Sequence, residues 1–207
     1  MYTHQKQYIT AGKPIAEAGG ALIMIHGRGG TAENIISLAE ELNAGELAIY
    51  APQASNHSWY PYSFMAADNQ NQPALNSAIE VIGELVEEIV SKGIPAEKIY
   101  FLGFSQGACL TLEYIARNAK QYGGAVAFTG GLIGQQLDVS KYTGDLNGTP
   151  VLITTGDPDP HVPLTRVEES VALLKKLNAD VNVTVFNGRP HTIIQQEIDL
   201  ADKYVFR

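Results

Sequence analysis

The sequence lacks several features that would assign it to other classes of protein. Cys109 is its only cysteine, so no disulfide can form within the chain, which is compatible with a reducing compartment. Basic residues are in the minority: 14 Lys and Arg face 22 Asp and Glu, a formal net charge of -8. Because such a surface repels phosphate groups, we expect neither nucleic acid nor an anionic membrane surface as a partner.

Long apolar segments are also absent. No run approaches the roughly 20 residues of a transmembrane helix, and the polar residues 1–10 contain no apolar core of a signal peptide. We therefore expect a cytoplasmic protein that does not insert into membranes. No repeat or linker divides the 207 residues, which predict one domain over residues 1–207 that is too short for a large cap domain.

Short apolar runs alternate with longer helical patterns. The runs predict strands at residues 7–10, 21–25, 47–51, 99–102, 124–129, 151–155 and 181–186. Helices are predicted at residues 31–42, 73–92, 106–118, 164–177 and 192–204. Strands such as Ala-Leu-Ile-Met-Ile at 21–25 are apolar at consecutive positions, as is typical of strands covered on both faces. The pattern predicts an α/β fold with a mostly parallel, doubly wound sheet and helices on both faces.

The strongest chemical signal is Gly-Phe-Ser-Gln-Gly at residues 103–107, between a predicted strand and a predicted helix. This is the context of a nucleophile elbow, a sharp turn that exposes its serine. The positive end of the following helix would stabilise developing negative charge beside that serine. The alternative is a glycine-rich turn without chemistry, which the flanking strand and helix disfavour. The motif predicts Ser105 as a nucleophile.

A nucleophilic serine needs a base, and the base needs an acid to orient it. In this kind of fold the chain order is serine, acid, histidine, and only His161 and His191 follow Ser105. His161 shares a loop with the candidate acids and would compete with them for position, whereas His191 follows the last predicted strand. We therefore predict His191 as the base. Asp157 and Asp159 are both candidates for the acid, and spacing alone does not choose between them.

Two backbone amides would bind the oxyanion of an acyl-transfer reaction. One normally belongs to the residue after the nucleophile, here Gln106. The other comes from a loop after an early strand, and His-Gly-Arg-Gly-Gly at residues 26–30 fits this position. These glycines match neither a P-loop nor a dinucleotide-binding fingerprint, which disfavours a phosphate-binding loop.

Together with residues 157–163 and 188–191, these motifs resemble the phospholipase/carboxylesterase family of α/β-hydrolases, which includes bacterial carboxylesterases and acyl-protein thioesterases. They occur in family order over most of the chain. The resemblance implies an α/β-hydrolase fold and no metal or organic cofactor. It also implies Asp159 as the acid and Arg28 as the donor of the first oxyanion amide.

The aromatic residues 58–64 differ from the motif of the thioesterases and look more like the short-chain bacterial esterases. We therefore predict a carboxylesterase for small to medium esters that works through a Ser-His-Asp triad and an acyl-enzyme. The alternatives are a thioesterase or lysophospholipase, and a non-catalytic ligand-binding protein of this fold. The expected partner is a small-molecule ester, and a homodimer is left open.

Five apolar side chains are candidates for the substrate pocket, although the aromatic ones could equally pin a long loop to the core. They are Trp59, Tyr62, Phe64, Met65 and Leu132. The guanidinium of Arg28 would either be solvated or reach an acidic group on the substrate. Cys109, one helical turn beyond Ser105, is predicted to pack as a small apolar residue.

Overall fold

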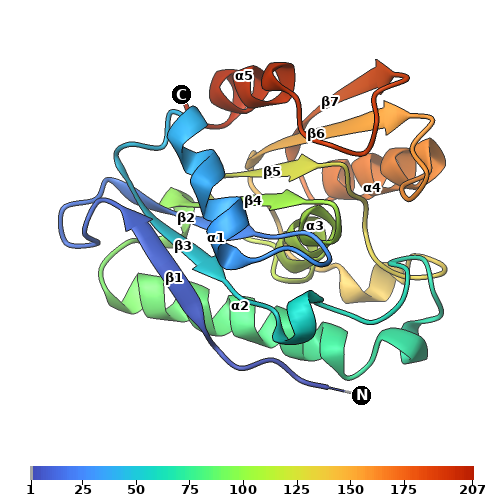
Figure 1. The fold of residues 1–207 in the computed structure, drawn as a ribbon, viewed down its shortest axis with the longest axis horizontal. Helices are drawn as coiled ribbons and strands as arrows, with labels where there is room; N and C mark the ends of the chain where they lie inside the picture. Colours follow the sequence, from blue (N-terminus) through green and yellow to red (C-terminus); the bar gives the residue numbers. More distant parts are fainter. Residues whose placement is uncertain (1) are drawn as a thin grey trace.

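The computed structural model describes residues 2–207, whose strands form one seven-stranded sheet (Figure 1). The order across the sheet is β1-β3-β2-β4-β5-β6-β7. Only β1 and β3 pair antiparallel, and the other neighbours are parallel. The strands are β1 (Tyr8–Gly12), β2 (Gly20–Ile25), β3 (Leu47–Pro52), β4 (Ile99–Phe104), β5 (Gly124–Phe128), β6 (Pro150–Asp157) and β7 (Asp180–Asn187). This confirms the predicted mostly parallel sheet.

Helices cover both faces of the sheet, as Figure 1 shows. They are α1 (Ala32–Ile36), α2 (Ala74–Ser91), α3 (Gln106–Arg117), α4 (Leu164–Lys176) and α5 (Gln195–Tyr204). One face packs under α2, α3 and α4, and the other packs under α1 and α5. Strand β2 shows why its run is continuously apolar: Ile23 and Ile25 enter the first core, while Leu22 and Met24 enter the second.

Two predicted helices differ in extent from the structure. The helix predicted at residues 31–42 is divided into α1 and a 3-10 helix, η1 (Ser37–Glu41). At this junction the hydroxyl of Ser37 donates to the carbonyl of Asn34 at 3.0 Å, a local bond that competes with regular helix geometry. The helix predicted at 192–204 begins only at Gln195, because Ile194 is extended and its amide donates to the Glu197 carboxylate at 2.9 Å.

The loops that carry the predicted chemistry meet at the carboxyl-terminal edge of the parallel strands. Ser105 follows β4, residues 26–30 follow β2, Asp159 follows β6 and His191 follows β7. In open α/β sheets, ligands bind at this edge. None of the helices in residues 2–207 is long and apolar enough to cross a bilayer.

Candidate active site

Ser105 occupies a sharp turn between β4 and α3. Its backbone has φ 53° and ψ -115°, a conformation that non-glycine residues rarely adopt, and its amide donates to the carbonyl of Phe128 at 3.0 Å. The flanking glycines make this turn sterically feasible. A Cβ on Gly103 would lie 2.2 Å from the Gly107 carbonyl oxygen, and one on Gly107 would lie 2.1 Å from the carbonyl oxygen of Ile25. The turn therefore depends on close backbone contact among β4, α3 and β2.

A chain of two hydrogen bonds runs from Ser105 to a buried carboxylate. Nε2 of His191 lies 2.8 Å from Oγ of Ser105, and Nδ1 lies 2.9 Å from Oδ2 of Asp159. The other carboxylate oxygen accepts the amides of His161 and Val162, both at 2.9 Å. Burial raises the pKa of Asp159, but the bonds from His191 and from the two amides outweigh it and hold the pKa below its ordinary value. An ionised Asp159 fixes the proton of His191 on Nδ1 and leaves Nε2 free to accept a proton.

The other two candidates from the sequence lie outside this chain of hydrogen bonds. The ring of His161 is exposed and meets the ring of His191 edge-on at 4.9 Å, while only its backbone amide bonds Asp159. Asp157 is exposed at the end of β6. The structure thus brings Asp159 and His191, rather than Asp157 and His161, to Ser105.

One pocket, which we name the serine pocket, has a volume of about 210 Å³ and is lined by Arg28, Ser105 and Gln106 among others. Gln106 is the first residue of α3, so its amide has no carbonyl partner within the helix. Arg28 lies in the loop after β2, which is closed by a bond from the amide of Gly30 to the carbonyl of Gly27 at 3.1 Å. The amide of Gln106 therefore lies next to Ser105 without a helical partner, and Arg28 stays the predicted donor of the second oxyanion amide.

The side chain of Arg28 is bound within the protein. Its guanidinium donates to Oγ of Ser58 at 2.9 Å, to the carbonyl of Pro61 at 3.0 Å and to the carbonyl of Tyr62 at 2.6 Å. Arg28 is an exposed residue, as expected for a solvated guanidinium, but its guanidinium also holds residues 58–62, which we name the strap. The strap crosses from the end of β3 toward α2.

The side chain of Gln106 binds the same strap. Its amide oxygen accepts the backbone N–H of Trp59 at 2.8 Å, and its amide nitrogen donates to the carbonyl of Tyr60 at 2.8 Å. The two residues predicted to donate the oxyanion amides are thus both tied to one segment. The strap fixes the distance between β2's loop and the start of α3.

Comparison with known proteins gives the family of this chain. The profile of the phospholipase/carboxylesterase family matches residues 8–206. A solved phospholipase/carboxylesterase from Dyadobacter fermentans DSM 18053 is 61% identical and covers 100% of this chain and 99% of its own, with a TM-score of 0.99. The chain belongs to the phospholipase/carboxylesterase family. This confirms the predicted α/β-hydrolase fold.

Curated relatives of this family member have hydrolase names. A probable carboxylesterase, SOBER1-like, from Arabidopsis thaliana is 24% identical over 68% of this chain and 53% of its own length. Acyl-protein thioesterase 1 from Gibberella zeae is 27% identical over 66% of this chain and 59% of its own length. The chain thus spans little more than half the length of these two relatives. Their names are those of a probable carboxylesterase and an acyl-protein thioesterase.

Of the five side chains predicted to form the substrate pocket of this phospholipase/carboxylesterase, Phe64 lines the serine pocket. Trp59 and Leu132 are completely buried, which corrects them to core residues. Tyr62 is 56% exposed and faces solvent, and Met65 packs against the core. A pattern of aromatic residues marks the right segment but does not show which of its side chains face the cavity.

The serine pocket has further walls that the sequence interpretation missed. Tyr60, Cys109 and Val162 line it with Phe64. Burial raises the pKa of the Cys109 thiol to about 12, so the group stays a neutral thiol, as its predicted packing role requires. The spacing of four residues from Ser105 predicts that Cys109 lies one helical turn away, but it does not show that the thiol lines the pocket.

The loop of His191 is held by a buried ion pair that the sequence interpretation also missed. The guanidinium of Arg189 donates to the carbonyls of Pro190, at 2.9 Å, and of Thr192, which lie on either side of His191. It also stands 3.6 Å from the fully buried carboxylate of Glu197 on α5. Charges this deeply buried need partners, so the pair fixes the backbone that presents His191.

The chemistry that this site offers rests on side chains. Within residues 2–207, His, Cys, Asp and Glu side chains do not gather in groups of three or more that could hold a metal ion. The parts present are a hydroxyl on a strained turn, an imidazole hydrogen-bonded to it, and a carboxylate that orients the imidazole. Such an arrangement supports acyl transfer.

Proposed function

We propose that this protein is a serine carboxylesterase that hydrolyses small to medium carboxylic esters through an acyl-enzyme. The catalytic triad consists of Ser105, His191 and Asp159. The observation that carries the proposal is the chain of hydrogen bonds at 2.8 and 2.9 Å that joins these three side chains, with Ser105 on a strained turn. Homologues that are named carboxylesterases also support the proposal.

In the proposed mechanism, Nε2 of His191 takes the proton of the Ser105 hydroxyl while Oγ attacks the carbonyl carbon of the ester. The carbonyl oxygen becomes an oxyanion and accepts hydrogen bonds from the amides of Arg28 and Gln106. When the intermediate collapses, the alcohol leaves with the proton from His191. A water molecule, activated by the same histidine, then attacks the acyl-enzyme and releases the acid.

Thioester hydrolysis is the second candidate, because the relative from Gibberella zeae is named acyl-protein thioesterase 1. The same residues would serve, with a thiol in place of the alcohol as the leaving group. The size of the serine pocket, about 210 Å³, supports short acyl groups. Parallel assays with an acetyl ester, an acetyl thioester and a lysophospholipid would rank the three substrate classes.

The proposal is tested with p-nitrophenyl esters from acetate to long-chain acyl groups, using wild type and Ser105→Ala. We expect the wild type to be most active on short acyl chains and Ser105→Ala to lose at least about 10⁴-fold in kcat. A fluorophosphonate probe should label the wild type and not the variant. A folded Ser105→Ala protein that keeps its activity would disprove Ser105 as the nucleophile. A folded wild type that hydrolyses none of these esters would favour a specialised substrate or a binding function.

A further inference from the structure

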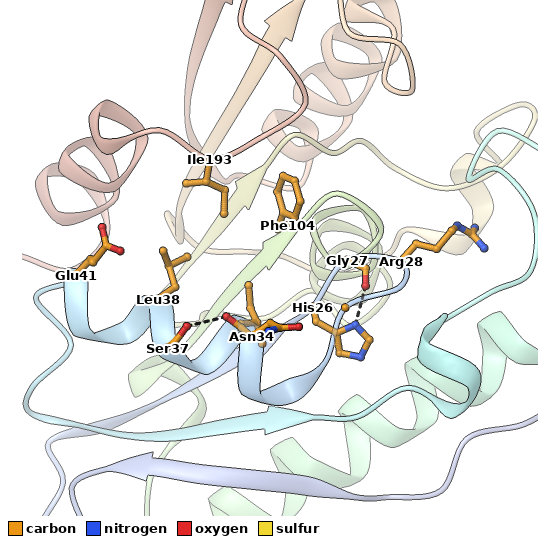
Figure 2. Close-up of a pocket in the computed structure, with 11 residues that line it drawn as sticks. His26, Gly27, Arg28, Asn34, Ser37, Leu38, Glu41, Phe104 and Ile193 are labelled. Atoms are coloured by element: carbon orange, nitrogen blue, oxygen red, sulfur yellow. Dashed lines mark hydrogen bonds between the residues drawn. The ribbon is translucent and has the colours of Figure 1, made fainter.

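A second cavity lies beside the proposed catalytic site and is separated from the serine pocket by the loop after β2. It has a volume of about 320 Å³, and its walls are α1 and η1 on one side and Phe104 and Ile193 on the other, as Figure 2 shows. We name it the α1 groove. Its size reaches the lower end of the usual range of small-molecule sites, about 300–1,000 Å³.

The floor and walls of the α1 groove are mainly apolar. Leu38 faces Phe104 and Ile193 across it (Figure 2), and Ile35 of α1 also lines it. Polar groups stand along the η1 side, where Asn34 and Ser37 also line the groove, and the exposed carboxylate of Glu41 stands at the same side. The groove therefore suits an apolar group the size of a benzyl ring.

The position of His191 indicates which half of an ester the α1 groove receives. The leaving oxygen takes its proton from His191, so the alcohol must lie on that residue's side of the reacting carbon. The ring of Phe104 packs on the ring of His191, with centroids 5.3 Å apart, and Ile193 follows His191 by two residues. Both line the α1 groove, so part of its wall is built from residues next to the proton donor.

The serine pocket suits the other half of the ester. In an acyl-enzyme the acyl group remains bonded to Oγ of Ser105, so it needs a pocket that Ser105 itself lines. Ser105 lines the serine pocket, together with Tyr60, Phe64 and Val162. At about 210 Å³ this pocket is the smaller of the two cavities beside the catalytic site.

We propose that the α1 groove is the binding site for the alcohol part of the substrate. This inference rests on the proposed esterase function and names its substrate class: esters of a short acyl group with an apolar aryl or arylalkyl alcohol. The enzyme then selects its substrates mainly by the alcohol, because the α1 groove is larger and more apolar than the serine pocket and gains more from an apolar ring.

The test uses two isomeric esters in which the large and small halves are exchanged. Benzyl acetate places the ring on the alcohol, and methyl phenylacetate places it on the acid. We expect wild type to hydrolyse benzyl acetate with a kcat/KM at least about tenfold higher, because one apolar group placed in a fitting pocket changes this ratio by roughly that factor or more.

Variants of residues that line the α1 groove test whether the preference for benzyl acetate arises there. Leu38→Trp fills it and should lower kcat/KM for benzyl acetate about tenfold while methyl phenylacetate changes less than about twofold. Because Leu38 is half-buried, Asn34→Trp, at an exposed position of the same wall, provides a second variant that does not disturb the core. Glu40→Trp is the matched control, since Glu40 is an exposed residue of η1 that does not line the groove.

The outcomes separate this inference from the proposed function. Equal kcat/KM for the two isomers, or a preference for methyl phenylacetate, would overturn the assignment of the groove while leaving the esterase function intact. The same holds if Leu38→Trp and Asn34→Trp affect both isomers equally, or if Glu40→Trp acts as they do. Loss of the proposed function itself would show differently, as turnover of both isomers that persists in Ser105→Ala or as no turnover of either.

Discussion

Arg28 has two distinct connections to the proposed site, one through its amide and one through its guanidinium. The amide is proposed to bind the oxyanion, and the guanidinium holds Ser58 and the carbonyls of Pro61 and Tyr62. A planar guanidinium has five donors and can bind several acceptors at once, which an ammonium group does less well. The loop after β2 and the strap are therefore held together by one side chain, which makes Arg28 a positioning residue as well.

We expect Arg28→Leu to lower kcat about tenfold with little change in KM. This loss is smaller than the 10²–10³-fold effect of removing an oxyanion donor, because the backbone amide of residue 28 remains but is less well fixed. Arg28→Lys should give an intermediate kcat. Steady-state kinetics on p-nitrophenyl acetate measures both parameters. Thermal unfolding serves as the control, since Arg28 is exposed and its loss should change stability little. An unchanged kcat in Arg28→Leu would show that the strap holds the loop without the guanidinium.

The turn between β4 and α3 brings three elements so close together that a side chain at one of its glycines would clash with backbone atoms. A Cβ on Gly107 would lie 2.1 Å from the carbonyl oxygen of Ile25 and 2.7 Å from that of His26, and neither backbone atom can move without shifting β2. In contrast, a Cβ on Gly83 in α2 would meet the nearest atom outside its own helical turn, in the ring of Tyr114, at an ordinary 3.8 Å. Substitution by alanine is therefore expected to change the free energy of unfolding in opposite directions at these two helical glycines.

Gly107→Ala should lower the free energy of unfolding by about 1–3 kcal/mol, the usual cost of overpacking. Gly83→Ala should raise it by about 0.5–1 kcal/mol, because alanine loses less backbone entropy in a helix than glycine does. Urea unfolding of both variants against wild type gives the two values. Effects of the same sign would contradict the backbone contact between α3 and β2.

At the scale of elements, most of the fold could be predicted because its signals are local. Buried parallel strands such as β2 and β5 require apolar residues at consecutive positions, and all seven predicted strands overlap with strands of the structure. The end of α1 and the start of α5 could not be predicted, because they depend on particular hydrogen bonds. Ser37 bonds the carbonyl of Asn34, and Glu197 bonds the amide of Ile194 while it also pairs with Arg189.

The catalytic residues and the cavity walls also differ in how local their sequence signals are. The five-residue motif specifies the turn that predicts Ser105, and the position of His191 after the last predicted strand selects it over His161. Chain order leaves Asp157 and Asp159 open, and only the resemblance to the family implies Asp159. The walls of the cavities come from residues far apart in the chain, and burial decided which of them face inward. Trp59 is drawn into the core because its indole donates to the carbonyl of His26 at 2.9 Å, a contact between residues 33 positions apart.

At the scale of the whole molecule, charge adds to the selectivity that shape provides. The net charge is -8, and the exposed carboxylate of Glu41 lines the α1 groove. An alcohol that carries a negative charge would approach the groove against this field. The repulsion should be sensitive to salt, since the Debye length falls from about 30 Å at 0.01 M to about 3 Å at 1 M ionic strength.

We therefore expect 4-acetoxybenzoate, with an anionic alcohol part, to be hydrolysed several-fold more slowly at low salt than the neutral 4-acetoxybenzamide. The difference in kcat/KM between the two esters should shrink as salt is raised from 0.01 to 1 M, because the anionic ester reacts faster. Salt has this effect since exposed charges separated by more than a Debye length are screened. Glu41→Gln should narrow the difference at low salt without abolishing it, because the rest of the acidic excess remains. The neutral amide is the internal control for any general effect of salt on the enzyme. Equal rates at low salt, or a ratio that salt does not change, would mean that alcohols are selected by shape alone.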